Sequence, residues 1–163
     1  MRRATVLTAV GLVALLPASV ADARIVPQTS IADVAVGDST KEVKAELGAP
    51  DKIKNGMDDF GAFTRYSYDD PLVGITFKTG EDGLQVTSIT SKGKGERTKS
   101  GVGVGSTEQE VKAGVEGETC KTFFEEFRSC YLGKQQAGRI VTDFSINTET
   151  GKVQRVVLGR VID

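Results

Sequence analysis

The chain has 163 residues with 21 basic and 22 acidic side chains, and it contains neither histidine nor tryptophan. The absence of histidine excludes Ser-His-Asp and Cys-His catalysis as well as HExxH zinc sites. The formal net charge of −1 gives no reason to expect nucleic acid or an anionic membrane as a partner.

Residues 1–23 have the pattern of a secretory signal peptide: a basic start, an apolar stretch at 4–16 and Ala-Asp-Ala at 21–23. We expect cleavage after Ala23 and a mature chain that is secreted or held in the cell envelope or periplasm. A retained membrane anchor is the alternative. Removing these residues leaves 140 residues with 19 basic and 21 acidic side chains, enough for one ordinary domain or two small ones. No later apolar run is long enough to span a membrane.

Two stretches of the mature chain repeat each other. VAVGDSTKEVKA begins at Val34 and VGVGSTEQEVKA begins at Val102, an offset of 68 residues. Each copy contains a capping box, Ser39 with Glu42 and Thr107 with Glu110, followed by apolar residues four apart. Each copy therefore predicts a helix of about two to three turns, which is too short to be stable without packing against another element.

Alternating apolar and polar residues follow each predicted helix and indicate strands. The ranges are 63–69, 72–78 and 84–92 after the first helix, and 130–133, 139–147 and 152–162 after the second. Strand parity predicts one apolar face, formed in the first copy by Tyr66, Tyr68, Val73, Ile75 and Phe77. It places Phe63, Arg65, Ser67, Thr76 and Lys78 on the opposite face.

The fold class expected from these elements is α+β. We expect two tandem repeats, 24–92 and 102–163, each a short helix packed on a three- to four-stranded antiparallel sheet. Residues 93–101 are the expected linker, a Gly- and Lys-rich segment that we interpret as a solvated connector. A basic binding patch is the alternative for this segment.

Cys120 and Cys130 are the only two cysteines. In an exported chain an even number of cysteines at close spacing predicts a disulfide, which would stabilise the fold by about 3 kcal/mol. A redox or metal role is disfavoured because the spacing is not Cys-x-x-Cys and no histidine completes a zinc site. We expect no metal and no cofactor.

Adjacent carboxylates occur at 58–59, 69–70, 81–82 and 125–126, in sequence typical of turns. Two facing carboxyl groups could serve a hydrolase, which stays an alternative. The glycine-rich GVGVGS lacks the Gly-Lys-Ser/Thr ending of a phosphate-binding loop. We therefore expect that the protein is not an enzyme.

The repeated stretch resembles the opening motif of BamE/SmpA-type envelope proteins, although Asp38 and Ser106 stand where that motif has Met. The tandem form with a disulfide is similar to the secreted β-lactamase inhibitory protein family. The matching residues are Gly37, Ser39, Val43, Leu47, Gly48 and Pro50 in the first copy, and Gly105, Thr107, Val111, Cys120 and Cys130 in the second. The resemblance implies helix-on-sheet modules without catalytic activity, and for the inhibitory family a concave sheet and a hairpin loop that bind an enzyme.

We therefore expect an exported, non-enzymatic protein-binding module, with inhibition of a secreted or periplasmic enzyme as its narrower form. An envelope-associated structural or assembly factor is the alternative. Asp69 and Asp70 could imitate an anionic ligand, although turn chemistry explains them better, and parity places Tyr68 in the core. The candidate partner-binding residues are Phe63, Arg65, Tyr68, Asp69, Asp70, Phe123, Phe124 and Phe127.

Overall fold

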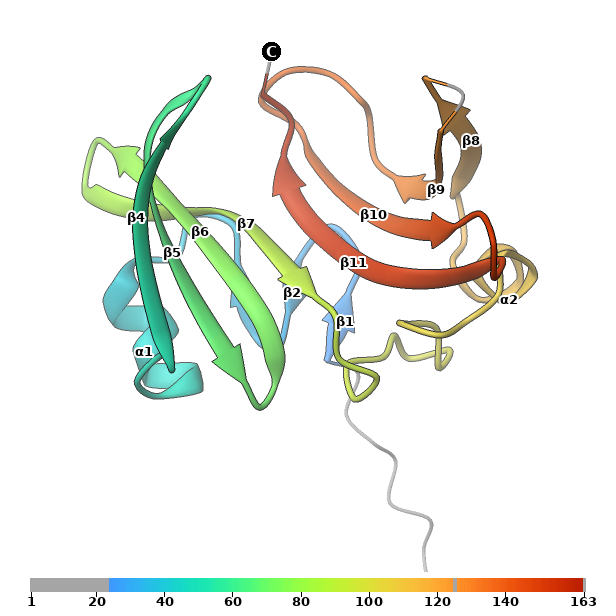
Figure 1. The fold of residues 1–163 in the computed structure, drawn as a ribbon, viewed down its shortest axis with the longest axis horizontal. Coiled ribbons are helices and arrows are strands. Elements are labelled where there is room, and N and C mark those ends of the chain that lie inside the picture. The colour runs from blue at the N-terminus through green and yellow to red at the C-terminus, as the bar shows by residue number, and fades with distance from the viewer. Residues whose placement is uncertain (1–23, 125, 163) are drawn as a thin grey trace, which may run out of the picture.

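The computed structural model describes residues 24–124 and 126–162 (Figure 1). The predicted signal peptide and Glu125 lie outside the described residues. Three short strands come first: β1 (Ile25–Val26), β2 (Ser30–Ile31) and β3 (Val34–Ala35). The next elements are α1 (Thr40–Leu47), β4 (Lys52–Asp58), β5 (Gly61–Asp69), β6 (Leu72–Gly80) and β7 (Gly83–Ser91). The last are α2 (Glu108–Gly114), β8 (Thr119–Phe123), β9 (Phe127–Leu132), β10 (Ile140–Asn147) and β11 (Lys152–Arg160).

Eight of these strands form one antiparallel sheet in the order β4-β5-β6-β7-β11-β10-β9-β8. Each half of the chain contributes four consecutive strands, and the halves join where β7 pairs with β11. Ile89 lies opposite Leu158 at this seam, and both side chains are fully buried. Strands β1, β2 and β3 form a separate small sheet.

The expected α+β fold of two helix-on-sheet repeats is wrong, because the protein is mostly β with one continuous large sheet. The helices have eight and seven residues and bury one side chain each, Val43 and Val111, so they cover little of the sheet. The N-terminal strands help to fill the core instead, with Ile25, Ile31 and Val34 buried. Pairing β7 with β11 gives the last strand of each half a partner for its backbone N–H and C=O groups.

Several local predictions are confirmed. Both capping boxes are present, with the side chains of Ser39 and Thr107 accepting from the amides of Glu42 and Glu110. Tyr66 pairs with Ile75 and Tyr68 pairs with Val73 across β5 and β6, as parity required. The edge strands β4 and β8 were not predicted.

The core lies on one face of the large sheet. Figure 1 shows α1, α2 and the N-terminal strands on the same side, while the hairpins β4–β5 and β8–β9 rise at the two ends of the other side. The buried sheet residues include Tyr66, Ile75, Phe77, Val86, Ile89, Phe144, Ile146, Val153, Val156 and Leu158. No helix within residues 24–124 and 126–162 covers the opposite face of the sheet.

The segment between the halves is packed against the rest of the protein. Glu96 and Thr98 are buried, and Glu96 accepts a hydrogen bond from the Ser91 hydroxyl. The Arg97 guanidinium donates to the carbonyls of Gly101 and Val104. This part of the chain is therefore less solvated than the composition of the predicted linker indicated. Within residues 24–124 and 126–162, no helix is long and apolar enough to cross a membrane.

Candidate binding surface on the concave face

Polar and charged side chains line the face of the sheet that the helices leave free. Cross-strand pairing places Arg65 beside Thr76, and Thr76 beside Ser88. On the other half, Asp143 lies opposite Val157 and Ser145 opposite Arg155. We call this surface, from Arg65 on β5 to Phe127 on β9, the concave face.

The concave face is hollowed by three adjoining cavities of about 320, 340 and 560 Å³. Arg65 borders the 320 and 340 Å³ cavities. Arg155 borders the 320 and 560 Å³ cavities, and Asp143 borders the 340 and 560 Å³ cavities. Gly74 and Gly159 lie in the floor and contribute no side chain. The three cavities share lining residues and therefore adjoin, and we call them together the groove.

Arg65 and Arg155 both border the 320 Å³ cavity of this groove. Arg65 donates through Nε and Nη2 to Thr76 Oγ1, at 3.2 and 3.1 Å, and its guanidinium lies 6.0 Å from the Phe63 ring centroid. Arg155 donates through Nε to Ser145 Oγ at 3.1 Å. Neither arginine forms an ion pair with a residue that the structure describes.

Asp143 organises the hydroxyl groups beside Arg155. Its carboxylate accepts hydrogen bonds from the hydroxyls of Ser129 and Ser145, the second at 2.8 Å. The Ser145 hydroxyl in turn accepts from Arg155. This chain of hydrogen bonds holds the Arg155 side chain at the edge of the 560 Å³ cavity.

Exposed aromatic side chains stand at the tip of the β8–β9 hairpin. Phe124 and Phe127 are 88% and 59% exposed, and Phe123 lies opposite Phe127 in the strand pair. Phe123 is held by Tyr131, at a ring distance of 6.0 Å, and by Lys121, whose Nζ is 4.4 Å from the Phe123 ring centroid. These phenylalanines border the 560 Å³ cavity.

The opposite end of the sheet also carries exposed apolar side chains. Met57 and Phe60 are 76% and 52% exposed at the β4–β5 hairpin. Near that hairpin Lys78 forms an ion pair with Asp58 at 2.6 Å. The hydrogen bond from Lys78 is the largest cause of the lowered pKa of Asp58.

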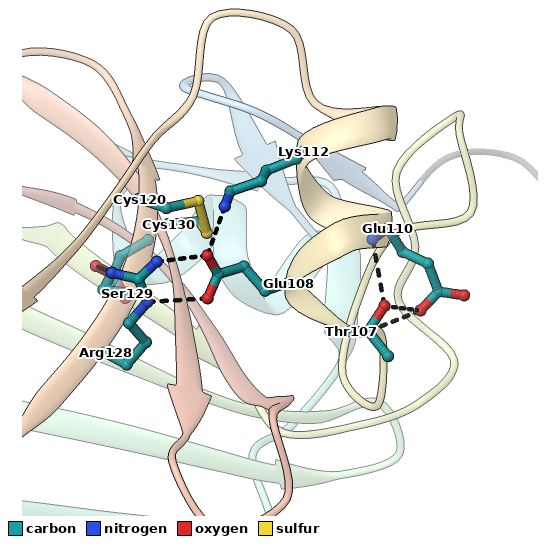
Figure 2. The surroundings of a disulfide bond; sticks show 9 residues. Thr107, Glu108, Glu110, Lys112, Cys120, Arg128, Ser129 and Cys130 are labelled. Carbon is teal, nitrogen blue, oxygen red and sulfur yellow. Dashed lines mark hydrogen bonds and ion pairs between the residues drawn. A yellow bond between two sulfur atoms is a disulfide. The ribbon is translucent and has the colours of Figure 1, made fainter.

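A disulfide and an ion-pair cluster lie beneath the aromatic hairpin (Figure 2). The predicted disulfide between Cys120 and Cys130 is confirmed and joins residues that face each other in β8 and β9. Arg128 donates through Nε to Glu108 at 2.9 Å, and Lys112 lies 2.7 Å from the same carboxylate. Hydrogen bonds from Arg128, and secondly from Lys112, lower the pKa of Glu108 to about 2.

The ligand atoms of Glu108, Cys120 and Cys130 lie within 4.8 Å of one another, a spacing that a metal ion would permit. The two sulfur atoms are bonded to each other, however, and the carboxylate is occupied by Arg128 and Lys112. A metal ion needs deprotonated thiolates as ligands, so these three residues do not fit a metal site.

The predicted partner-binding residues fall in four places. Phe63 and Arg65 lie on the concave face near one end, and Phe123, Phe124 and Phe127 lie near the other. Asp69 borders the 320 Å³ cavity, and Asp70 is exposed at the β5–β6 turn. Tyr68 is only 2% exposed, and its hydroxyl donates to the Gly48 carbonyl at 3.3 Å, so it belongs to the core.

Sequence reasoning did not select Asp143, Ser145 and Arg155. Alternation along the predicted strand 139–147 puts Asp143 and Ser145 on the face opposite Phe144 and Ile146, so the sequence does contain a signal for them. For Arg155 the signals conflict, because alternation from Val153 places it in the core and alternation from Val156 places it on the opposite face. A register shift in the β10–β11 pair lets Val153 and Val156 both be buried and turns Arg155 to the concave face.

The geometry thus defines a mostly-β protein with one curved antiparallel sheet and a polar, aromatic-edged groove. No protein-family model and no curated protein matches the chain. Among solved structures, it is similar to YjgB, a DUF4309 family protein from Bacillus subtilis, with a TM-score of 0.51 and 17% identity. That match covers 87% of this chain and 90% of YjgB, and it supports a shared fold alone.

A second solved structure is an extracellular protein containing an SCP domain from Bacillus anthracis. Its TM-score is 0.49 at 12% identity, and the match covers 77% of this chain and 44% of that protein.

Proposed function

We propose that this protein is an exported, non-enzymatic module that binds a protein partner through its concave face. The proposal is carried by two features of the groove: Arg65 and Arg155 have no ion-pair partner among residues 24–124 and 126–162, and Phe124 and Phe127 are exposed at its edge. Arginine and aromatic side chains are enriched at the centres of protein interfaces and supply much of their binding energy. The Cys120–Cys130 disulfide supports export, because disulfides persist in oxidising compartments.

The test is affinity capture from culture fluid and envelope fractions with purified, immobilised residues 24–163. We expect a saturable partner that is lost when Phe124 and Phe127 are both replaced by Ser. Leu84→Ser is the matched control, because Leu84 is also a partly exposed apolar residue but borders none of the three cavities. Recovery of no protein above background in either fraction would contradict the proposal.

The narrower form of this function is inhibition of a secreted or periplasmic enzyme. It is tested by adding the purified protein at micromolar concentration to a panel of such enzymes, β-lactamases included. An inhibited enzyme would regain activity with the Phe124→Ser/Phe127→Ser variant. If no enzyme in the panel is inhibited, the narrower form is dropped. Fractionation of the producing cells then separates a released binder from an envelope-associated assembly factor, which would stay with the cells.

A further inference from the structure

We infer that the partner segment bound in the concave groove is acidic and carries an apolar side chain: its carboxylates meet Arg65 and Arg155, and its apolar group packs beside Phe123 and Phe127. This inference rests on the proposed function and specifies the chemistry of the partner.

The first support is the charge of the 320 Å³ cavity, which holds Arg65 and Arg155. The chain as a whole has a net charge of −1, yet three basic residues and one acidic residue line the 320 Å³ cavity. The basic residues are Arg65, Lys92 and Arg155, and the acidic residue is Asp69. A basic cavity on a slightly acidic protein complements an acidic segment and repels a basic one.

The second support is that both guanidinium groups are fixed while donors remain free. No described residue accepts a hydrogen bond from Nη1 or Nη2 of Arg155, because only its Nε is used, toward Ser145. Arg65 directs Nε and Nη2 at one hydroxyl oxygen, Thr76 Oγ1, which leaves Nη1 free of described acceptors. A guanidinium has five N–H donors and binds carboxylates through two of them at once.

Fixing these arginines before binding lowers the conformational entropy lost on association. Arg155 is held by the Ser145 hydroxyl, which itself is bound to Asp143. Arg65 is held by Thr76 and by the ring of Phe63. An arginine that served only solubility would not need such support.

The third support is that the basic cavity adjoins the cavity lined by phenylalanines. Arg155 borders both the basic cavity and the 560 Å³ cavity, which Phe123, Phe124 and Phe127 also line. A segment with its carboxylates at Arg155 therefore meets an aromatic surface directly beyond them. Nucleic acid fits the basic 320 Å³ cavity less well, because phosphate binding needs a more extensive basic patch than its two arginines and one lysine.

The test uses synthetic peptides and NMR of ¹⁵N-labelled residues 24–163. The probes are Glu-Glu-Phe-Glu-Glu-Phe, the same peptide with Lys for Glu, the same peptide with Ser for Phe, and an oligothymidylate. We expect the Glu/Phe peptide to shift amides of Arg65, Gly74, Ser145 and Arg155 and of the 123–127 hairpin, and to bind at least about tenfold more tightly than the other three probes. Raising the salt concentration should weaken this binding.

The matched variants are Arg65→Gln/Arg155→Gln and, as a control, Lys41→Gln/Lys99→Gln, which removes two exposed charges that line none of the three cavities. We expect at least about a tenfold loss of Glu/Phe peptide affinity for the arginine variant and no loss for the control. The amide spectra of both variants without peptide establish that they are folded.

Three results would overturn the inference: equal binding of the Lys/Phe peptide, preferential binding of the oligothymidylate, or no shifts on the concave face at millimolar peptide. The affinity capture separates these failures from failure of the proposed function. A captured partner that binds the Arg65→Gln/Arg155→Gln variant as well as the parent would refute the acidic chemistry while leaving a protein-binding module. Absence of any partner would remove both.

Discussion

Arg128 on β9 and Glu108 at the start of α2 form a two-pronged ion pair, with Nε and Nη2 of the guanidinium directed at the two carboxylate oxygens (Figure 2). The two side chains are 27% and 24% exposed, so the pair is partly shielded from water. Lys112, one turn along the helix, contacts the same carboxylate. The pair therefore ties α2 to the strand next to Phe127, which stands in the candidate binding surface.

Replacing Arg128 by Met should lower the free energy of unfolding by about 1–3 kcal/mol, because a partly buried carboxylate loses two charge-assisted hydrogen bonds. Urea denaturation monitored by circular dichroism measures this change. Glu108→Gln and the double variant complete a mutant cycle, in which the double variant should cost less than the sum of the single variants. Additive costs would show that the two residues do not interact in solution.

The same ion pair predicts how stability depends on pH. Arg128 and Lys112 hold the pKa of Glu108 at about 2 in the folded protein, below its ordinary value of 4.5. As the pH falls, the unfolded chain therefore binds a proton at Glu108 before the folded protein does. The stability that the ion pair contributes is complete above pH 4.5 and is lost as the pH falls toward 2. The measurement is urea unfolding of the parent and Glu108→Gln between pH 7 and pH 2. Their difference should shrink as the pH falls, and a constant difference would contradict the assignment.

Much of the local structure could be predicted from the sequence because its signals are short-range. Both capping boxes, the Tyr66–Ile75 and Tyr68–Val73 pairs and the disulfide were all predicted correctly. Each depends on residues no more than ten positions apart, where side-chain type and spacing determine the geometry.

The assembly of these elements could not be predicted, because it depends on residues far apart in sequence. Nothing in the pattern of either half indicates that Ile89 on β7 pairs with Leu158 on β11. The apolar residues Ile25 and Ile31 precede the first repeated stretch, and their place in the core follows only from the joined sheet. We expected each short helix to cover a sheet of its own, but each helix buries only one side chain.

In the groove, too, the residue set by local alternation was predicted and the residue set by strand pairing was not. Parity places Arg65 correctly, since β5 alternates without interruption along its inner half. Arg155 was not predicted, because the register shift beside Ser145 reverses the alternation of buried and exposed residues along β11. Such a shift depends on the partner strand as much as on the local sequence.

The continuous sheet predicts that both halves of the protein unfold together. Leu158 is fully buried at the seam, so Leu158→Ala should cost about 2–5 kcal/mol. In urea titrations followed by NMR, amides of β6 and β10 should lose intensity at the same midpoint, and both midpoints should fall by the same amount in the variant. Two separate midpoints in the parent protein would mean that the halves are independent folding units.

The disulfide in the β8–β9 hairpin is expected to stabilise the folded protein. Cys120 and Cys130 join the two strands that present Phe123 and Phe127. Cys120→Ser/Cys130→Ser should lower the free energy of unfolding by about 3 kcal/mol, mainly by releasing a constraint on the unfolded chain. Thiol titration of the unfolded, unreduced parent should detect no free thiol, and dithiothreitol should destabilise the parent but leave the variant unchanged.

Binding should also respond to the loss of the disulfide, because β8 is an edge strand whose paired neighbour in the large sheet is β9. Without the bond between them, the 123–127 segment should exchange its amide hydrogens faster, while Phe144 on β10 stays protected. The Glu/Phe peptide should then bind the Cys120→Ser/Cys130→Ser variant more weakly, since the hairpin must be ordered on binding. Unchanged exchange in the hairpin together with unchanged peptide affinity would show that the ion pair of Arg128 with Glu108 suffices to hold it.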